Sequence, residues 1–194
     1  MAKYGARYLR FAPFAAENAE PDNSYPNDGT AVSVGKLVKV GDAPSLVEAK
    51  HYADDELDEY VAEIGETDLD IEVSEISNDV ATSVLGASKD EQTGDVAFGE
   101  DTAPYGGLGF VSCRIVNGVK GYIGVYYPKV KAAMQGEDYE TKGENITFAN
   151  GKLKMKASLA KNHKWKVISA SKATPELAKT WVDQKLGAPA SSNH

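Results

Sequence analysis

Few residues in the sequence have the types and spacing that catalysis needs. The histidines are His51, His163 and His194, and none stands in a G-x-S-x-G or comparable nucleophile setting. His51 falls in an alternating strand pattern and His163 in an expected turn, so both are expected to be structural or solvated. Cys113 is the only cysteine, lies among apolar strand residues, and is expected to serve as a small hydrophobic side chain. With one cysteine, an intramolecular disulfide or a thiolate metal cluster is impossible. The sequence therefore predicts no catalytic residue.

One acidic motif is similar to a metal-binding loop. Asp68-x-Asp70-x-Glu72 has the spacing with which a calcium loop begins. The sixth position of such a loop needs glycine, but here it is Val73 within a strand pattern. The glycine-rich segment 106–109 precedes a strand instead of a helix, which argues against a phosphate cradle. We therefore expect no metal site, no cofactor and no enzymatic activity.

The acidic motif belongs to a longer acidic stretch, residues 53–79, with the sequence ADDELDEYVAEIGETDLDIEVSEISND. No Lys or Arg occurs between His51 and Ser88. Within the stretch, D-L-D-I-E-V alternates strictly between acidic and apolar residues, which indicates a strand with one wet and one packed face. The twelve acids of the stretch are Asp54, Asp55, Glu56, Asp58, Glu59, Glu63, Glu66, Asp68, Asp70, Glu72, Glu75 and Asp79.

Bulk composition bounds the class of protein. The chain has 194 residues, 42% of them hydrophobic, a net charge of -8 and a sequence pI near 4.9. This content supports a folded core, and the charge argues against a surface that grips nucleic acid throughout. No apolar run is long enough for a signal peptide or a membrane span, so we expect synthesis in the cytoplasm and no membrane partner.

Most of the chain shows β patterns and turn signals. We expect strands at the N-terminus and in segments 32–40, 45–52, 60–64, 68–76, 145–148, 152–159 and 164–170. Asn117-Gly118 predicts a tight hairpin between the strands FVSCRIV and VKGYIGVYY. Residues 11–31 and 87–106, rich in glycine, proline and polar residues, are expected to be long loops.

Two short helices complete the expected fold. One follows the capping residues Ser77, Asn78 and Asp79 and stops at Gly86, and the other begins at Thr174-Pro175. The fold class is therefore mainly β, with two packed sheets, a flanking helix, a long N-terminal loop and a short C-terminal helix. We expect one domain over residues 1–187 and a flexible tail over residues 188–194.

Three stretches together resemble the major tail proteins of long-tailed, non-contractile bacteriophages, which form the tail tube. They are KYGARYLRFAPF, followed by a proline-rich loop and VGKLVKV; then EAKHYADDELDEYVAEIGETDLDIEVSEISNDVATSVLG; then GFVSCRIVNGVKGYIGVYYPKVKAAMQGEDYETKGENITFANGKLKMKA. The resemblance implies a β-sandwich or half-barrel with a flanking helix. It also implies rings, usually of six subunits, that stack into a conduit for DNA and meet tape measure, tail terminator and distal tail proteins. The implied location is the virion, after synthesis in the host bacterial cytoplasm.

The acidic stretch then has a candidate role. Duplex DNA carries one negative charge per about 1.7 Å of its axis, so an acidic bore repels it and lets it slide without specific binding. Alternatively, these acids cover an outer face or a subunit interface. The candidates for the bore lining are Asp68, Asp70, Glu72, Glu63 and Glu66.

The later part of the chain is basic and suggests contacts between subunits. Lys152, Lys154 and Lys156 alternate with apolar residues, so they share one exposed strand face. Opposite charges on one chain suit head-to-tail association, although they could neutralise each other within a subunit, or the lysines could protect a sheet edge. In the N-terminal loop, the candidate apolar anchors for a neighbouring subunit are Phe11, Phe14 and Tyr25, unless they pack on their own domain.

Two alternatives remain open. The first is a β-sandwich module that binds carbohydrate through an aromatic row drawn from Tyr122, Tyr126, Tyr127 and Trp165. The second is a tube protein of a related contractile or secretion device, which uses the same fold.

Overall fold

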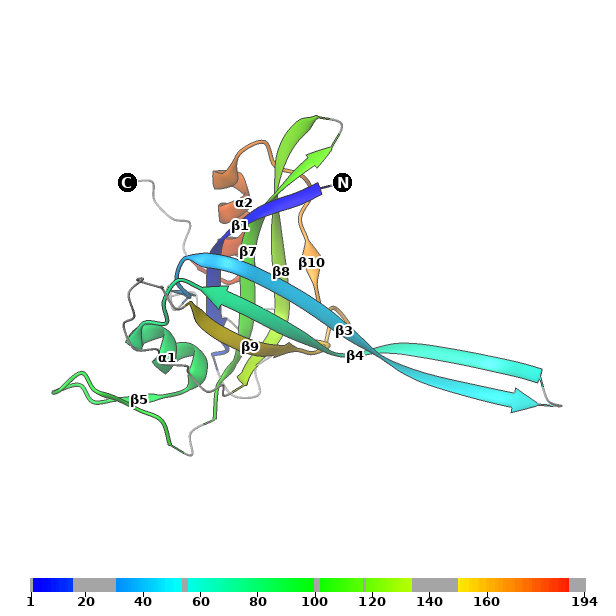
Figure 1. The fold of residues 1–194 in the computed structure, drawn as a ribbon, viewed down its shortest axis with the longest axis horizontal. Helices are drawn as coiled ribbons and strands as arrows, with labels where there is room; N and C mark the ends of the chain where they lie inside the picture. The colour runs from blue at the N-terminus through cyan, green and yellow to red at the C-terminus, as the bar shows by residue number, and fades with distance from the viewer. Residues whose placement is uncertain are drawn as a thin grey trace, which may run out of the picture.

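The computed structural model describes residues 2–15, 31–53, 56–99, 102–116, 118–133 and 150–188, with residues 2, 3, 51–53 and 56–59 described as backbone only. Twelve elements follow each other along this part of the chain (Figure 1). The strands are β1 (Ala2–Pro13), β2 (Val32–Ser33), β3 (Leu37–Ala53), β4 (Glu56–Val73), β5 (Ser88–Lys89), β6 (Val96–Ala97), β7 (Tyr105–Val116), β8 (Val119–Ala133), β9 (Gly151–Ala157) and β10 (Val167–Ile168). The helices are α1 (Asn78–Leu85) and α2 (Pro175–Lys185).

Eight strands form one antiparallel sheet in the order β2-β1-β7-β8-β9-β4-β3, with β10 also paired to β8. The sheet curls so that β1 and β3 contact each other, and the Val34 N–H donates to the Leu9 carbonyl at 3.1 Å. β5 and β6 form a small second sheet. The predicted fold class, a mainly β half-barrel with a flanking helix, is confirmed.

The concave side of the curled sheet holds the main core. Alternate residues of β4, β7, β8 and β9 point into it, including Leu69, Leu108, Ile123 and Met155, each at most 1% exposed. Helix α1 contributes Val80 and Val84 to the same core. Strict alternation along β4 and β9 therefore places the charged residues of these strands on the outer surface.

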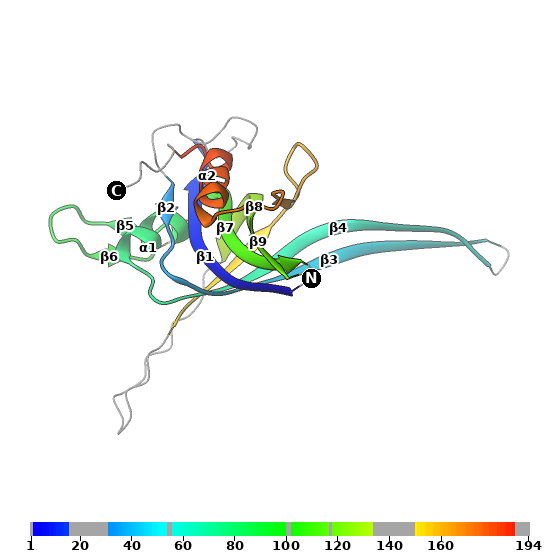
Figure 2. The same ribbon diagram turned by 90° about the horizontal axis from the view of Figure 1, so that it is seen from above.

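Helix α2 covers the other face of β7 and β8, as seen from above (Figure 2). Gly109 and Gly124 leave room for it: a Cβ at Gly124 would lie 2.4 Å from a Trp181 ring carbon, and one at Gly109 2.6 Å from Val182. Both sites lack a side chain because the helix lies directly on the strand backbone. A small second core forms there around Val182 and Leu186.

Local signals predicted both helices and the central hairpin. The Ser77 and Thr174 side chains accept hydrogen bonds from the first turns of α1 and α2, and Gly86 ends α1 in the left-handed region at φ 76°. Gly118 has φ 79° in the turn between β7 and β8, as the Asn-Gly signal predicts.

Several expected boundaries are wrong. β1 continues to Pro13, so the long N-terminal loop does not begin at residue 11, and residues 87–106 contain the β5–β6 hairpin and the start of β7. The expected strands 45–52, 60–64 and 68–76 belong to two long strands, β3 and β4, because backbone pairing continues past the acidic residues. The expected strand 145–148 lies outside the described residues, and of the expected flexible tail only Ala188 is described, buried beside α2.

Candidate assembly surfaces

The outer face of β4 and β9 is a ladder of opposite charges. Asp68 lies directly across from Lys156, Asp70 from Lys154, and Glu72 from Lys152. The lysines, Asp68 and Asp70 are exposed and Glu72 is half-buried, while the intervening Leu153 and Met155 are buried. The predicted exposed lysine face is thus confirmed. The acids and lysines that the sequence assigned to separate roles share one surface and oppose each other within one subunit.

One end of this charge ladder is closed by an ion pair. Lys156 Nζ lies 2.8 Å from Glu66 Oε2, and this hydrogen bond, with the nearby Asp68 carboxylate, raises the pKa of Lys156. Both side chains are exposed, so the pair contributes little to stability. Four of the five predicted lining acids therefore have a lysine across the ladder or in contact, and Glu63 alone of the five lies beyond it.

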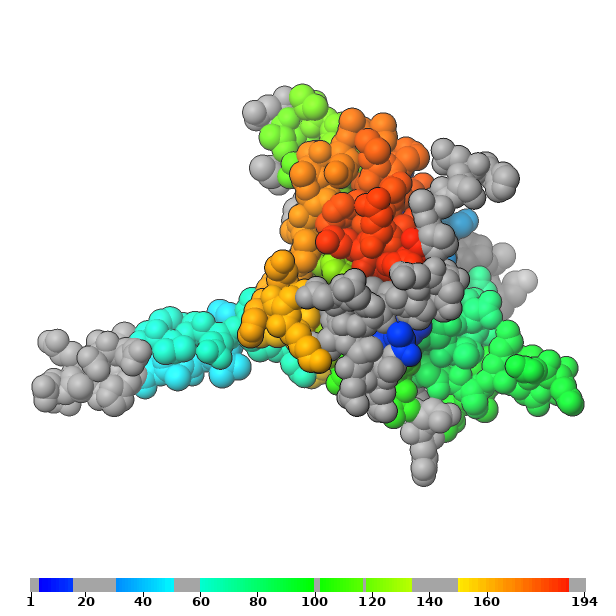
Figure 3. Space-filling model, turned by 180° about the vertical axis from the view of Figure 1, so that it is seen from behind, coloured from blue at the N-terminus to red at the C-terminus, as the bar shows by residue number. Residues whose placement is uncertain are grey.

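Beyond the charge ladder, β3 and β4 leave the body as a two-stranded arm, defined here as residues 45–53 and 56–66. It projects far from the body in the ribbon and in the space-filling view (Figures 1 and 3). One face carries Leu46 opposite Ile64, and the other carries Val47 opposite Glu63. Leu46 is 58% exposed and Val47 65% exposed. A hairpin of two strands is at best marginally stable alone in water, and this arm leaves apolar side chains exposed on both of its faces.

A clamp fixes the root of the arm. Asp42 Oδ2 on β3 accepts hydrogen bonds from Tyr127 Oη, at 3.1 Å, and from Lys166 Nζ. The Tyr127 ring is buried and lies 6.2 Å from the Trp165 ring. Burial, and then the Asp42 carboxylate, raise the pKa of Tyr127 well above its usual range, so its hydroxyl stays a donor. A bulge between Pro44 and Leu46 follows this clamp.

The three residues predicted as apolar anchors differ in their burial and contacts. Phe11 is fully buried in the main core, paired across β1 and β7 with Leu108, so its prediction as an inter-subunit anchor is wrong. Phe14 is half-buried and stacks on Tyr105 with ring centroids 6.4 Å apart, so it packs on its own domain. Tyr25 lies outside the described residues.

The aromatic row required for a carbohydrate module is not formed. Tyr126 is 5% exposed because α2 covers it, and Tyr127 is 1% exposed in the main core. Tyr122 is half-buried and Trp165 packs against the core. These side chains therefore do not present one stacking surface for a sugar.

Among the described residues, the candidate catalytic side chains do not form a common site. Cys113 is buried, as expected, and its Sγ accepts a hydrogen bond from Arg7 at 3.2 Å. His163 lies in the expected turn with φ 56°, and the side chains of His51 and His194 lie outside the described part. Among the described residues, no group of three or more His, Cys, Asp or Glu side chains is placed to hold a metal ion. Neither described helix has the length and apolar content that crossing a bilayer requires.

Sequence analysis missed the arm, although its signal is present. β-branched and aromatic residues continue through SLVEAKHY and YVAEI on both sides of the acidic turn. Comparison with protein-family models finds no match, and comparison with curated proteins finds none either.

Proposed function

We propose that this protein is a structural subunit that self-assembles head to tail into rings, six subunits being expected, which stack into the tail tube of a long-tailed bacteriophage. The observation that supports this best is the arm. It exposes apolar side chains on both faces, far from the body of its own subunit. In a homopolymer, a second copy of the chain is always present and can cover these exposed side chains.

The arrangement is heterologous in this proposal, because residues 45–66 carry one lysine against eight acids and would repel the same segment of a second copy. A surface that pairs with a different surface on the next copy builds closed rings or open stacks. Among the described strands, β3 forms one edge of the sheet, and it offers a further row of backbone groups for pairing between subunits.

In this proposal the tube conducts DNA without specific binding. Each subunit has a net charge of -8, so an assembled wall repels phosphates overall. The charge ladder on β4 and β9 does not supply a purely acidic lining, because three lysines stand opposite its three acids. Repulsion in the bore must then come from acids such as Glu63 that have no lysine opposite.

Assembly can be tested on the purified chain by sedimentation velocity and negative-stain microscopy over a range of concentrations. We expect rings or tubes for the native chain. We expect monomers for a variant with Leu46→Ser, Val47→Ser and Val61→Ser in the arm. Leu177→Ser is the control, since Leu177 is 53% exposed on α2, outside the arm.

Two outcomes would contradict the proposed assembly, and a third would contradict the proposed DNA conduit. A native chain that stays monomeric at high concentration would remove its basis, and so would normal assembly of the triple arm variant. Tubes that retain duplex DNA in a mobility-shift assay at moderate salt would oppose the conduit role. A tube from a contractile or secretion device would assemble too, and the protein complement of purified particles distinguishes these sources.

A further inference from the structure

The charges of the described chain are segregated. Segments 2–15, 102–116, 118–133 and 150–175 contain no Asp or Glu. The arm with its turn, residues 45–66, has one lysine, Lys50, against eight acids. These acids are Glu48, Asp54, Asp55, Glu56, Asp58, Glu59, Glu63 and Glu66.

The carboxylate-free segments meet at the end of the β7–β8 hairpin, beside the start of β1. Lys120 Nζ lies 6.0 Å from the centroid of the Tyr4 ring and 5.6 Å from that of Tyr122, and the Arg7 guanidinium lies 5.5 Å from the Tyr122 centroid. Arg114 donates from Nε to Ser171 Oγ at 3.3 Å. Lys172 exchanges backbone hydrogen bonds with Tyr122. Tyr4 and Tyr122 both pair with Cys113, and Lys172 pairs with Tyr122, so these side chains share one face, whereas Arg114 pairs with Gly121 and lies on the opposite face. We call the shared face the basic–aromatic patch: Tyr4, Arg7, Lys120, Tyr122 and Lys172.

The patch cations are available to a partner. None of the ion pairs between described residues involves Arg7, Lys120 or the half-buried Lys172. Tyr4 is 44% exposed, and Arg7 and Lys120 are also exposed. Cations held over aromatic rings next to exposed ring surface can contact both carboxylates and apolar side chains.

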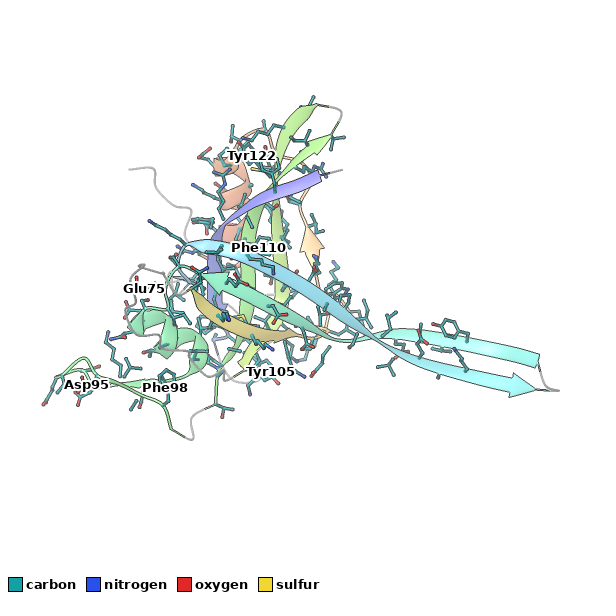
Figure 4. The ribbon with its side chains drawn as sticks, in the orientation of Figure 1. Glu75, Asp95, Phe98, Tyr105, Phe110 and Tyr122 are labelled. Carbon is teal, nitrogen blue, oxygen red and sulfur yellow. The ribbon has the colours of Figure 1, made fainter. Side chains whose placement is uncertain are left out.

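The arm has the complementary chemistry. It carries exposed Glu48 and Glu63 on opposite faces, next to the apolar Leu46 and Val47. The arm and the patch lie at different ends of the molecule, with Tyr122 near the upper hairpin in Figure 4 and the arm pointing away. The arm therefore does not reach the patch of its own subunit.

Building on the proposed function, the geometry points to a specific contact: the acidic arm of one subunit docks on the basic–aromatic patch of the next copy. Carboxylates of the arm pair with Arg7 and Lys120, and its apolar side chains cover the rings of Tyr4 and Tyr122. Complementary charge sets the direction of the contact and its register. The two surfaces are different, so the contact propagates head to tail.

A charge-swap experiment tests this contact. The patch variant is Arg7→Glu with Lys120→Glu, and the arm variant is Glu48→Lys with Glu63→Lys. Each variant alone opposes like charges, so sedimentation velocity should show self-association weakened at least about tenfold. A 1:1 mixture pairs each altered surface with a complementary one on the other variant, and it should restore association.

Matched controls carry the same charge changes elsewhere. Lys164→Glu with Lys185→Glu matches the patch variant, and Glu75→Lys with Glu91→Lys matches the arm variant; all four residues are exposed. Both controls should assemble like the native chain. Circular dichroism on every variant distinguishes lost association from lost folding, and the restored mixture independently requires that both variants are folded.

The outcomes separate this contact from the proposed function. If the native chain assembles and both charge variants also assemble normally, or if the mixture stays dissociated while the controls assemble, the arm–patch contact is wrong and the assembly function stands. If the patch variant assembles normally but loses binding to single-stranded DNA that the native chain shows, the patch serves a polyanion instead. If the native chain never associates, both proposals fail.

Discussion

Asp70 of β4 lies directly across from Lys154 of β9, although 84 positions separate them in the chain. The pair is the middle rung of the charge ladder, with Asp68 and Lys156 on one side and Glu72 and Lys152 on the other. Cross-strand pairs of opposite charge stabilise a sheet, whereas like charges directly opposite destabilise it. The ladder thus fixes the register of β4 against β9 on the solvent side, while Leu69 and Met155 fix it on the core side.

Reversing one charge of the central rung should weaken the sheet. Asp70→Lys places two lysines opposite each other and is expected to lower the free energy of unfolding by about 0.2–1 kcal/mol. Lys154→Glu should have a similar effect, and the double exchange should recover most of the loss. Urea denaturation measures all three against Asp95→Lys, a control in an exposed turn. If the double exchange lowers the free energy of unfolding by as much as the two single changes added together, Asp70 and Lys154 do not interact.

Filling the glycine contact between β8 and helix α2 should disturb the packing of the helix and destabilise the protein. Gly124→Ala places a methyl group 2.4 Å from the Trp181 ring, so either the helix shifts or the strand distorts. We expect a loss of about 1–3 kcal/mol, typical of overpacking. Tryptophan fluorescence should report the changed environment of Trp181. Gly99→Ala is the control, because no atom lies within 4 Å of its added Cβ and its φ is unremarkable; equal stability of both variants would refute the close contact.

The buried carboxylate of α2 predicts a pH-dependent effect. Tyr8 Oη donates to both oxygens of Asp183, at 3.0 and 2.8 Å, and Asp183 is 1% exposed. Burial raises the pKa of Asp183, while the Tyr8 hydrogen bonds oppose the rise. The folded state then binds the proton more tightly than the unfolded state. This contribution to stability is therefore fully present below the unfolded pKa and is lost as the pH rises through the folded pKa.

Tyr8→Phe leaves the carboxylate without its donor. Losing a hydrogen bond to a charged group costs about 1.5–3 kcal/mol, so Tyr8→Phe should cost more at about pH 7 than at about pH 5, because a lower pH favours the neutral carboxyl that needs the donor less. Urea denaturation at both pH values measures the difference between variant and native chain. Tyr4→Phe, which removes a partly exposed hydroxyl, should cost little at either pH. If Tyr8→Phe lowers the free energy of unfolding equally at both pH values, the protonation of Asp183 does not contribute to this effect.

Substitutions of Asp42 should destabilise the root of the arm, by an amount that depends on whether the new side chain can accept a hydrogen bond. Asp42→Ala removes the acceptor for Tyr127 Oη and the partner of Lys166, so a buried hydroxyl loses its hydrogen bond at a cost of about 1–3 kcal/mol. Asp42→Asn keeps an acceptor and should cost less. Denaturation gives the cost, and limited proteolysis of the arm reports whether its root has loosened. Equal stability of the alanine variant and the native chain would refute the clamp.

The sequence alone determined the features that depend on neighbouring residues. Ser77 and Thr174 cap their helices, Asn-Gly sets the central turn, and alternation along 68–73 places the acids on a solvent face, because these signals act through local backbone geometry and side-chain period. The lysine face of β9 followed from the same alternation. The mainly β class followed from the number of such segments.

Only the tertiary structure decided which surfaces meet. Alternation assigns Asp70 and Lys154 to exposed faces but cannot show that the two faces are one, since their pairing depends on the order of strands in the sheet. Phe11 was expected in a loop, yet β1 extends to bury it, because pairing with β7 satisfies its backbone and the core accepts its ring. The arm emerged for the same reason: hydrogen bonds between β3 and β4 continue past the point where the rest of the sheet ends.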